Sequence, residues 1–233
     1  MQRSMLKLVS IADLFSITNA LFGIFAIFFL LYDFLCCLDL RIRVSFSFIL
    51  LGLLADGIDG IIARKTRKSE IGEYLESMAD MTTLVIAPSV FIYFIYIDSI
   101  SGSIYRVFYL LFALILFLFF GIIRLASFHI MKEDKFFIGL PASASTILLI
   151  IPAYLQVDFI YILPMVIIIG AAMASDIKFL KTDTKINGVA FILILLTLIL
   201  SKDYQGFAPI LLFIAILVYS IGGPLYIRFL MKK

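Results

Sequence analysis

The residues best suited to chemistry in this sequence are the acidic ones of the stretch DGIDGIIARKTRKSEIGEYLESMAD. Asp56 and Asp59 are three residues apart, so on a helix they lie on the same side. Gly72, Glu76 and Asp80 follow at intervals of four, which stacks two carboxylates and a glycine on one face of a second helix. The spacing therefore predicts two helices, joined by a short basic turn, that bring four carboxylates together.

Four carboxylates gathered at a membrane surface repel one another and lose hydration, so a cation is needed to compensate them. Oxygen ligands suit hard ions such as Mg²⁺, Mn²⁺ or Ca²⁺, and the stretch has no cysteine or histidine that would favour zinc. The small residues Gly60, Ala63 and Gly72 leave room for a bulky ligand beside the metals. The alternative is a solvated, charged surface, and this accounts for Glu70 and Glu73.

The elements that must position these acids are membrane helices. Hydrophobic residues make up 64% of the 233 residues, charged residues 15%, and the mean hydropathy is +1.16, far above that of a soluble domain. We therefore expect an all-α polytopic helical bundle that forms a single membrane domain over residues 1–233. The N-terminal stretch lacks a plausible signal-peptide cleavage site, so we expect it to be retained.

Apolar runs near the roughly 20 residues that span a bilayer recur between charged turns, and they predict about eight transmembrane helices. The predicted spans are residues 13–33, 44–64, 74–97, 105–127, 139–156, 159–174, 186–201 and 207–228. Assigning the N-terminus and every second loop to one side places fifteen Lys and Arg residues there and four on the other. This bias predicts that both termini and the basic turn are cytoplasmic. Pro88, two turns beyond Asp80, predicts a bend and a freed carbonyl in the third span.

The acidic pattern, written D-x2-D-G-x2-A-R-x7-G-x3-[D/E]-x3-D, resembles the signature of the CDP-alcohol phosphatidyltransferase family. These integral membrane enzymes exchange the CMP of a CDP-lipid for an alcohol. Glu76 departs from the pattern, because the family has a third aspartate there and the extra methylene moves the oxygens outward. The resemblance implies a homodimer and two divalent ions, Mg²⁺ or Mn²⁺ with Ca²⁺ also able to bind, held by Asp56, Asp59, Glu76 and Asp80.

The same resemblance implies roles for individual residues. Asp80 would take the proton from the attacking hydroxyl, Arg64 would add a fixed positive charge, and Gly60 and Ala63 would make room for the cytidine. The residues expected to contact the CDP-lipid are Asn19, Gly60, Ala63, Arg64, Gly72 and Ser77. For Asn19 a helix-packing role is the alternative, and Ser77 could instead hydrogen-bond its own backbone.

Further segments resemble the phosphatidylserine synthase branch of the family. GIIRLA and KFFIGLP are similar to its arginine-bearing and F-x-G-L-P segments, which implies that Arg124 and Lys135 bind the acceptor. Ser127 stands where that branch has a second arginine, and MASDIKFLK is similar to its S-x-I-[R/K]-[F/Y] ending, although residues of this kind commonly serve as helix caps. The resemblance implies a catalytic core over residues 13–185, with two additional C-terminal helices over 186–228.

The leading hypothesis is therefore a cell-membrane enzyme of phospholipid synthesis, with its active site on the cytoplasmic side. It would transfer a phosphatidyl or archaetidyl group from a CDP-lipid to L-serine and release CMP. One alternative keeps the reaction but changes the acceptor to inositol phosphate or glycerol phosphate, which needs more clustered cations. A second alternative is a cation-coupled transporter, which predicts acids spread through the bilayer depth rather than gathered near one face.

Overall fold

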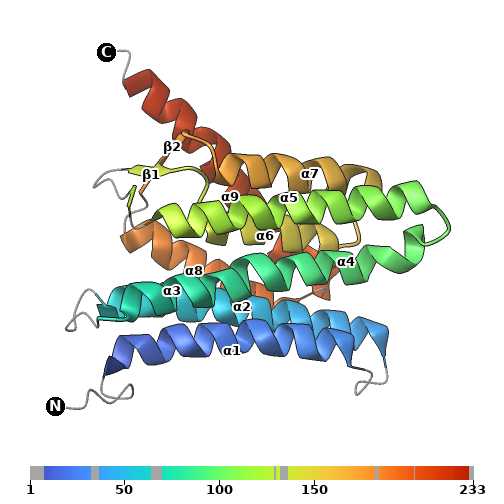
Figure 1. The fold of residues 1–233 in the computed structure, drawn as a ribbon, viewed down its shortest axis with the longest axis horizontal. Helices are drawn as coiled ribbons and strands as arrows, with labels where there is room; N and C mark the ends of the chain where they lie inside the picture. The colour runs from blue at the N-terminus through green and yellow to red at the C-terminus, as the bar shows by residue number, and fades with distance from the viewer. Residues whose placement is uncertain are drawn as a thin grey trace.

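Helices dominate the structure, a computed structural model that describes residues 8–32, 37–63, 70–128, 130–131, 136–181, 184–201 and 203–230. Figure 1 shows them as long, roughly aligned rods. Their bounds are α1 (Ile11–Leu31), α2 (Leu38–Ala63), α3 (Gly72–Asp80), α4 (Ala87–Ile100), α5 (Ile104–Phe128), α6 (Ala142–Tyr154), α7 (Phe159–Met173), α8 (Thr184–Leu200) and α9 (Asp203–Leu230). A π-helical segment, η2 (Met81–Ile86), joins α3 to α4 without a break. The all-α expectation is confirmed, and each predicted span coincides with a helix or with the α3–η2–α4 rod.

Within the described ranges, four helical stretches are long and apolar enough to cross a membrane: Ile11–Leu31, Gly72–Ile100, Ile104–Phe128 and Gly206–Arg228. Three shorter apolar helical stretches accompany them, Ala142–Tyr154, Phe159–Met173 and Ile186–Leu200. Many large apolar side chains point outward, for example Phe28 at 61% and Ile115 at 62% exposure. Apolar surface on this scale suits a lipid environment, so the chain is a membrane protein.

The π-helical segment lies at the centre of the packing. Its hydrogen bonds run from one residue to the fifth before it, as when the Ala87 N–H donates to the Thr82 carbonyl. Pro88 has no N–H to donate to the Leu84 carbonyl one turn earlier. That carbonyl instead accepts a 2.7 Å hydrogen bond from Thr146 Oγ1 of α6. The Leu84 carbonyl thus has a hydrogen-bond donor from another helix, while the bend and the freed carbonyl expected from Pro88 stay predictions.

Glycines on three helices allow this close packing. A Cβ atom on Gly23 of α1 would lie 2.5 Å from Thr83 Oγ1, and one on Gly121 of α5 would lie 2.5 Å from Val85 Cγ1. A Cβ atom on Gly52 of α2 would overlap Thr83 Cγ2. Since real Cβ atoms cannot approach so closely, these positions require glycine for helices α1, α2 and α5 to reach η2.

A short two-stranded sheet, which the sequence did not predict, lies at one end of the bundle. β1 (Phe136–Ile138) pairs antiparallel with β2 (Lys178–Leu180), with Phe137 opposite Phe179. Gly139 follows β1 with φ +76°, and a Cβ atom there would collide with the Met173 carbonyl. The strand of the FFIGLP segment and the strand of the IKFL segment therefore form one structural unit, and this geometry explains the glycine between them.

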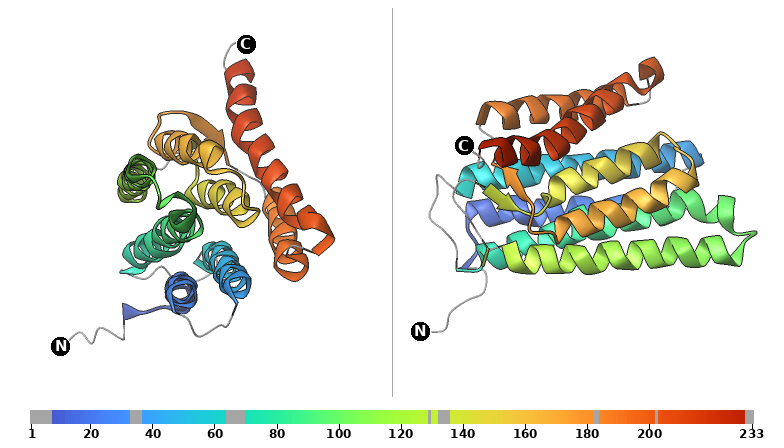
Figure 2. Two further views of the ribbon diagram at one scale, coloured as in Figure 1. Left: turned by 90° about the vertical axis from the view of Figure 1, so that its right-hand side faces the viewer. Right: turned by 90° about the horizontal axis from the view of Figure 1, so that it is seen from above.

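Seen along the helices in Figure 2, α1 to α7 surround the core and α8 with α9 lie together along one flank. Helix α8 packs on α2 and α9, while α9 also packs on α6 and β2. Figures 1 and 2 place the start of α1, the end of α9, the start of α3 and the β1–β2 sheet at the same end of the bundle. We call this end the carboxylate end, because α3 carries Glu76 and Asp80 there.

Candidate active site

The predicted acids lie on two helices at the carboxylate end. Asp56 is near the end of α2, and Glu76 and Asp80 are on α3; the side chains of all three are partly buried. Glu70 and Glu73 are exposed, as expected for acids on a solvated surface. The two helices predicted on either side of a basic turn are confirmed, although the turn itself, residues 64–69, lies outside the described residues.

Asp80 has a specific partner on α1. The side-chain amide of Asn19 donates from Nδ2 to Asp80 Oδ1 at 3.1 Å. Asn19 is completely buried, and its Oδ1 atom has no hydrogen-bond partner in the described part of the chain. An ionised carboxylate can only accept hydrogen bonds, so the NH₂ side of the amide must face it. This contact restricts the orientation of the Asp80 carboxylate.

A second hydrogen bond ties the same residue of α1 to η2. Thr83 Oγ1 donates to the backbone carbonyl of Asn19 at 2.7 Å, and both residues are fully buried. Asn19 thus contacts the segment that carries Asp80 twice, once through its side chain and once through its main chain. Thr83 was not among the predicted site residues; its position one helical turn after Asp80, with a hydroxyl in an apolar run, is the signal that could have identified it.

The donor chemistry of the site fits a hard divalent cation, because Asp56, Glu76 and Asp80 offer carboxylate oxygens alone. Within the described side chains, no three Asp, Glu, His or Cys residues form a group tight enough to hold a metal ion. The side chain of Asp59 lies outside this described set. No coordination geometry therefore follows from the structure.

The expected ligand contacts are described only in part. Gly72 begins α3, and Ser77 Oγ donates to its own helix at the Glu73 carbonyl, 3.0 Å away. This is the backbone alternative that the sequence left open for Ser77. Gly60 and Ala63 lie in the last turns of α2, and nothing is described beyond their backbone. Arg64 and Lys135 lie outside the described residues.

Arg124 is described, and it is 7% exposed near the end of α5. Its Nε donates to the Leu140 carbonyl at 3.4 Å, and its guanidinium lies 5.1 Å from the centroid of the Phe128 ring. This is the one hydrogen bond of the Arg124 side chain that is seen within the described part of the chain. The GIIRLA and FFIGLP segments are therefore in contact, and the contact carries a guanidinium, a group whose paired donors suit an anion.

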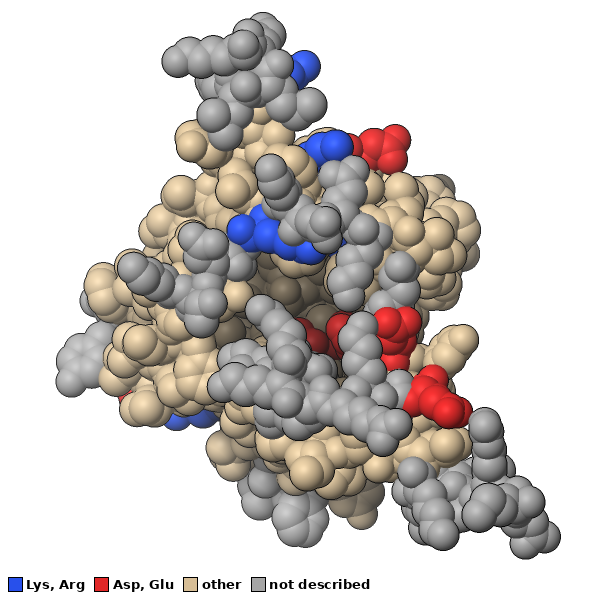
Figure 3. Space-filling model, turned by 90° about the vertical axis from the view of Figure 1, so that its left-hand side faces the viewer, with Lys and Arg blue, Asp and Glu red and all other residues tan. Residues whose placement is uncertain are grey.

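The β1–β2 sheet adds two cations at the carboxylate end. Lys178 Nζ lies 5.7 Å from the Phe136 ring centroid, and Lys181 Nζ lies 5.5 Å from that of Phe137. Figure 3 shows this end as a face hollowed between Lys and Arg side chains on one side and Asp and Glu side chains on the other. An acidic side suited to metals and a basic side suited to an anionic group therefore face each other across one hollow.

Helix α9 supports the basic side. Tyr219 Oη donates to the Leu180 carbonyl of β2 at 2.9 Å. No pattern in the sequence predicted this contact, because Tyr219 lies in an apolar span 39 residues beyond Leu180. The C-terminal helices are thus in direct contact with the sheet that carries the two lysines.

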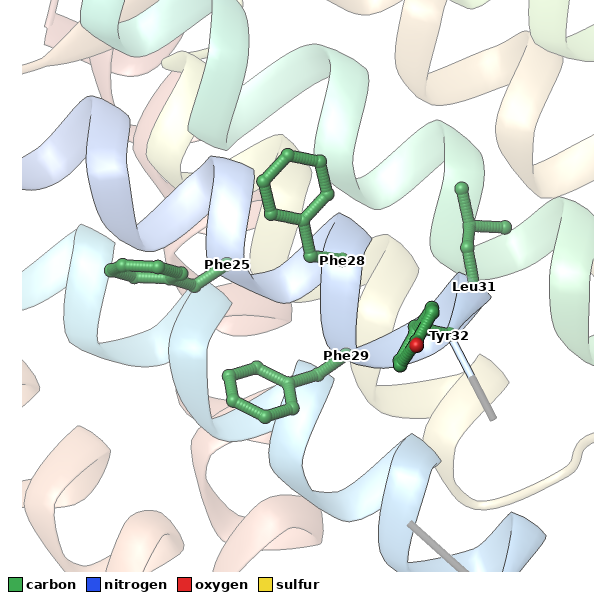
Figure 4. Close-up of a pocket in the computed structure, with 5 residues that line it drawn as sticks. All are labelled: Phe25, Phe28, Phe29, Leu31 and Tyr32. Carbon is green, nitrogen blue, oxygen red and sulfur yellow. The ribbon is translucent and has the colours of Figure 1, made fainter. Parts of the chain in front are cut away.

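A separate apolar pocket lies along the second half of α1, and Figure 4 shows its lining side chains. Its volume is about 590 Å³, and it is lined by Phe25, Phe28, Phe29, Leu31 and Tyr32. These residues lead toward the end of α1 that is remote from the carboxylate end. Phe29 stacks on Phe48 of α2 with ring centroids 5.3 Å apart. The pocket belongs to the apolar surface of the bundle and contributes no group to the carboxylate site.

Fold and site together define an all-α membrane protein with carboxylates on two helices at one end. A sequence model of the CDP-alcohol phosphatidyltransferase family matches residues 9–221. The chain therefore belongs to the CDP-alcohol phosphatidyltransferase family, and it is an enzyme of that class. Members of this family generally depend on divalent metals.

Individual relatives are similar over most of the chain. A CDP-diacylglycerol–serine O-phosphatidyltransferase of Methanocaldococcus jannaschii is 32% identical over 184 residues, covering 78% of this chain and 80% of the relative. A protein with the same name from Helicobacter pylori is 29% identical, covering 78% of each chain. An archaetidylserine synthase of Methanothermobacter thermautotrophicus is 26% identical, covering 75% of this chain and 71% of the relative.

Proposed function

We propose that this chain transfers a phosphatidyl or archaetidyl group from a CDP-lipid to L-serine and releases CMP. The observation that carries this proposal is the hollow at the carboxylate end, where Asp and Glu side chains face Lys and Arg side chains. A CDP-lipid needs its pyrophosphate charge compensated, and serine brings a carboxylate that needs a cation. The names of the relatives support serine as the acceptor.

The reaction balances with one proton acceptor. The serine hydroxyl oxygen attacks the phosphorus that bears the lipid, and a new O–P bond forms. The bond from that phosphorus to the bridging oxygen breaks, and CMP leaves with the bridging oxygen. Asp80 takes the hydroxyl proton, a general-base role that suits a carboxylate oriented by a buried amide and partly open to solvent.

Asp56, Asp59, Glu76 and Asp80 are the residues that would hold two divalent ions, Mg²⁺ or Mn²⁺, with Ca²⁺ able to bind in their place. When bound, such ions withdraw charge from phosphate oxygens and stabilise a departing nucleotide. Glu76 has the same charge as the aspartate of the family, and its side chain is one methylene group longer. We expect Gly60, Ala63, Arg64, Gly72 and Ser77 to line the place of the CDP-lipid.

Arg124 and Lys135 are the residues we assign to the serine carboxylate. The terminal nitrogens of Arg124 suit bidentate recognition of a carboxylate. Lys178 and Lys181 add charge on the same side, and this observation keeps inositol phosphate and glycerol phosphate as a second candidate class of acceptor. The gathering of acids at one end, together with the family assignment, favours the transferase over a transporter.

We further assign eight membrane crossings with both termini and the active site on the cytoplasmic side. The described cations support this orientation. Arg124, Lys178, Lys181 and Arg228 lie toward the carboxylate end, whereas Arg41, Arg43 and Arg106 lie at the other. The proposal includes one domain over residues 1–233, with a core over 13–185 and added helices over 186–228, and a homodimer. Labelling of single cysteines from each side of sealed vesicles, and the mass of the detergent-solubilised particle, test the orientation and the dimer.

The experiment that tests the reaction is CMP release by purified protein with CDP-lipid and Mg²⁺ or Mn²⁺. L-serine, inositol phosphate and glycerol phosphate are compared as acceptors, and the lipid product is identified. CMP release with serine alone supports the proposal. CMP release with inositol phosphate or glycerol phosphate would show that the acceptor is a phosphorylated alcohol. If Asp80→Asn keeps full activity while folded, the general-base assignment is wrong. Uptake of labelled substrate by sealed vesicles without CMP formation would support a transporter.

A further inference from the structure

The contacts of Asn19 with Asp80 and Thr83 give a role to residues that the mechanism has not used. We propose that Asn19 and Thr83 act together as positioning residues that orient the Asp80 carboxylate. This inference deepens the proposed function and rests on it. It assigns to Asn19 a role through Asp80 in place of the direct CDP-lipid contact predicted from the sequence.

Asn19 is buried behind Asp80. With 0% exposure and its amide NH₂ directed at Asp80 Oδ1, Asn19 has one donor committed to the carboxylate. A hydrogen bond to one oxygen restricts rotation of the carboxylate and so sets the direction of its second oxygen. Asn19 Oδ1 packs closely against Gly52, since a Cβ atom on this glycine would lie 3.0 Å from it. A buried side chain that hydrogen-bonds a reactive carboxylate, and does not itself face the solvent, is typical of a positioning residue.

Asn19 is itself held in place by Thr83. Thr83 donates its hydroxyl to the Asn19 carbonyl at 2.7 Å, and its methyl group fits against Gly52 while its hydroxyl lies against Gly23. We call this group of residues, Asn19, Gly23, Gly52 and Thr83, the glycine notch. Because the notch has no room for movement of Thr83, it fixes the register of α1 against the helix turn that begins at Asp80.

The geometry of η2 explains how the glycine notch influences the orientation of the Asp80 carboxylate. η2 begins at Met81, directly after Asp80, and each of its i to i+5 hydrogen bonds closes a loop one residue longer than the i to i+4 hydrogen bonds of an α-helix do. Such a turn rotates the carboxylates of α3 relative to the packed face of α4. Thr83 attaches this segment to α1 through its hydrogen bond to the Asn19 carbonyl. The orientation of Asp80 therefore depends on a hydroxyl three residues away, through Asn19.

Two pairs of variants isolate this hydroxyl. Thr83→Ser keeps the hydroxyl and Thr83→Ala removes it, with the same loss of the methyl group in both. The matched control pair is Thr146→Ser and Thr146→Ala. Thr146 is equally buried and donates a hydrogen bond of the same 2.7 Å length to the same segment, but to Leu84 rather than to Asn19. Asn19→Ala completes the set, and thermal unfolding in detergent identifies the temperature range in which every variant is folded.

Two readouts are measured on the full-length protein: kcat and KM for CMP release, and Mn²⁺ binding by electron paramagnetic resonance. We expect Asn19→Ala to lower kcat and Mn²⁺ affinity by about 10-fold or more, with KM for the CDP-lipid unchanged. Thr83→Ala should change both in the same direction, and Thr83→Ser should stay close to wild type. The Thr146 pair should show no such difference. Combining Asn19→Ala with Thr83→Ala should add little to Asn19→Ala alone, because both act on one carboxylate.

Several results would overturn the inference. A rise in KM for the CDP-lipid with kcat and Mn²⁺ affinity unchanged in Asn19→Ala would show direct substrate contact. Equal losses in Thr83→Ser and Thr83→Ala, or in the two alanine variants at 83 and 146, would show a general packing effect. If wild type releases no CMP with any acceptor, the proposed function fails, yet the Mn²⁺ comparison still tests the positioning role separately.

Discussion

Thr146 of α6 donates its hydroxyl to the Leu84 carbonyl at 2.7 Å, in the turn where Pro88 cannot supply an N–H. The proline and the threonine are 58 residues apart in the sequence, and the structure makes them complementary. The hydroxyl replaces the missing donor and attaches α6 to the central helix at its π-helical segment.

This pair predicts a coupled effect on stability. Thr146→Ala should destabilise the folded protein by about 1–3 kcal/mol, because a buried carbonyl loses its donor. In a Pro88→Ala background the same change should cost less, since the substituted alanine has a backbone N–H that can donate to Leu84. Thermal unfolding of the four proteins in one detergent measures the coupling. Equal costs in both backgrounds would contradict the complementarity.

The glycine notch predicts intolerance of side chains on α1. Gly23→Ala would place a Cβ atom 2.9 Å from Thr83 Cα, so backbone must move and α1 must separate from η2. We expect a loss of about 1–3 kcal/mol in stability together with lowered CMP release. Gly188→Ala in α8 is the control, because a Cβ atom there meets nothing within 4 Å. If the two variants behave alike in unfolding and activity assays, close packing at the notch is not required.

The proposed metal site predicts dependence on divalent ions and on one of two nearby glutamates. Chelation with EDTA should abolish CMP release, and added Mg²⁺ or Mn²⁺ should restore it. Glu76→Gln should lower activity by at least about 100-fold, because it removes a ligand charge, whereas exposed Glu73→Gln should have little effect. Activity at different metal concentrations separates weaker binding from slower turnover. Full activity of Glu76→Gln at a low concentration of metal ion would show that Glu76 is not a metal ligand.

The acceptor assignment predicts a selective effect of Arg124. Arg124→Lys keeps the charge but loses the planar pair of donors, so KM for serine should rise by about tenfold or more while KM for the CDP-lipid stays constant. Arg106→Gln, an exposed change toward the other end of α5, is the control. Steady-state kinetics with each substrate varied in turn makes the comparison. Equal rises in both KM values would indicate damage to the fold rather than loss of serine recognition.

The contact between α9 and the sheet predicts that the C-terminal helices stabilise the basic side. Tyr219→Phe removes the donor to the Leu180 carbonyl and should cost about 1 kcal/mol. Tyr226→Phe, also on α9 but 57% exposed, should leave stability unchanged. Thermal unfolding compares the two variants. An unchanged unfolding temperature in Tyr219→Phe would show that the sheet holds its place without α9.

Local regularities in the sequence were sufficient to predict the helices and the candidate acids. Apolar runs located the ends of the helices to within six residues, because helix length and lipid exposure act on each segment separately. The i, i+4 spacing of Gly72, Glu76 and Asp80 predicted the carboxylate face, since it depends only on helix geometry.

The tertiary structure alone decided which residues meet. Asn19 lies 61 residues from Asp80 and 64 from Thr83, and nothing periodic in the sequence links them. The sheet likewise joins two segments that the sequence shows separately, and Tyr219 reaches it from a third. These contacts depend on how closely helices approach, which glycines at Gly23 and Gly52 permit, and on a π-helical turn that a 3.6-residue pattern does not reveal. Helix formation is a local property, whereas the orientation of Asp80 results from the packing of helices that are distant in the sequence.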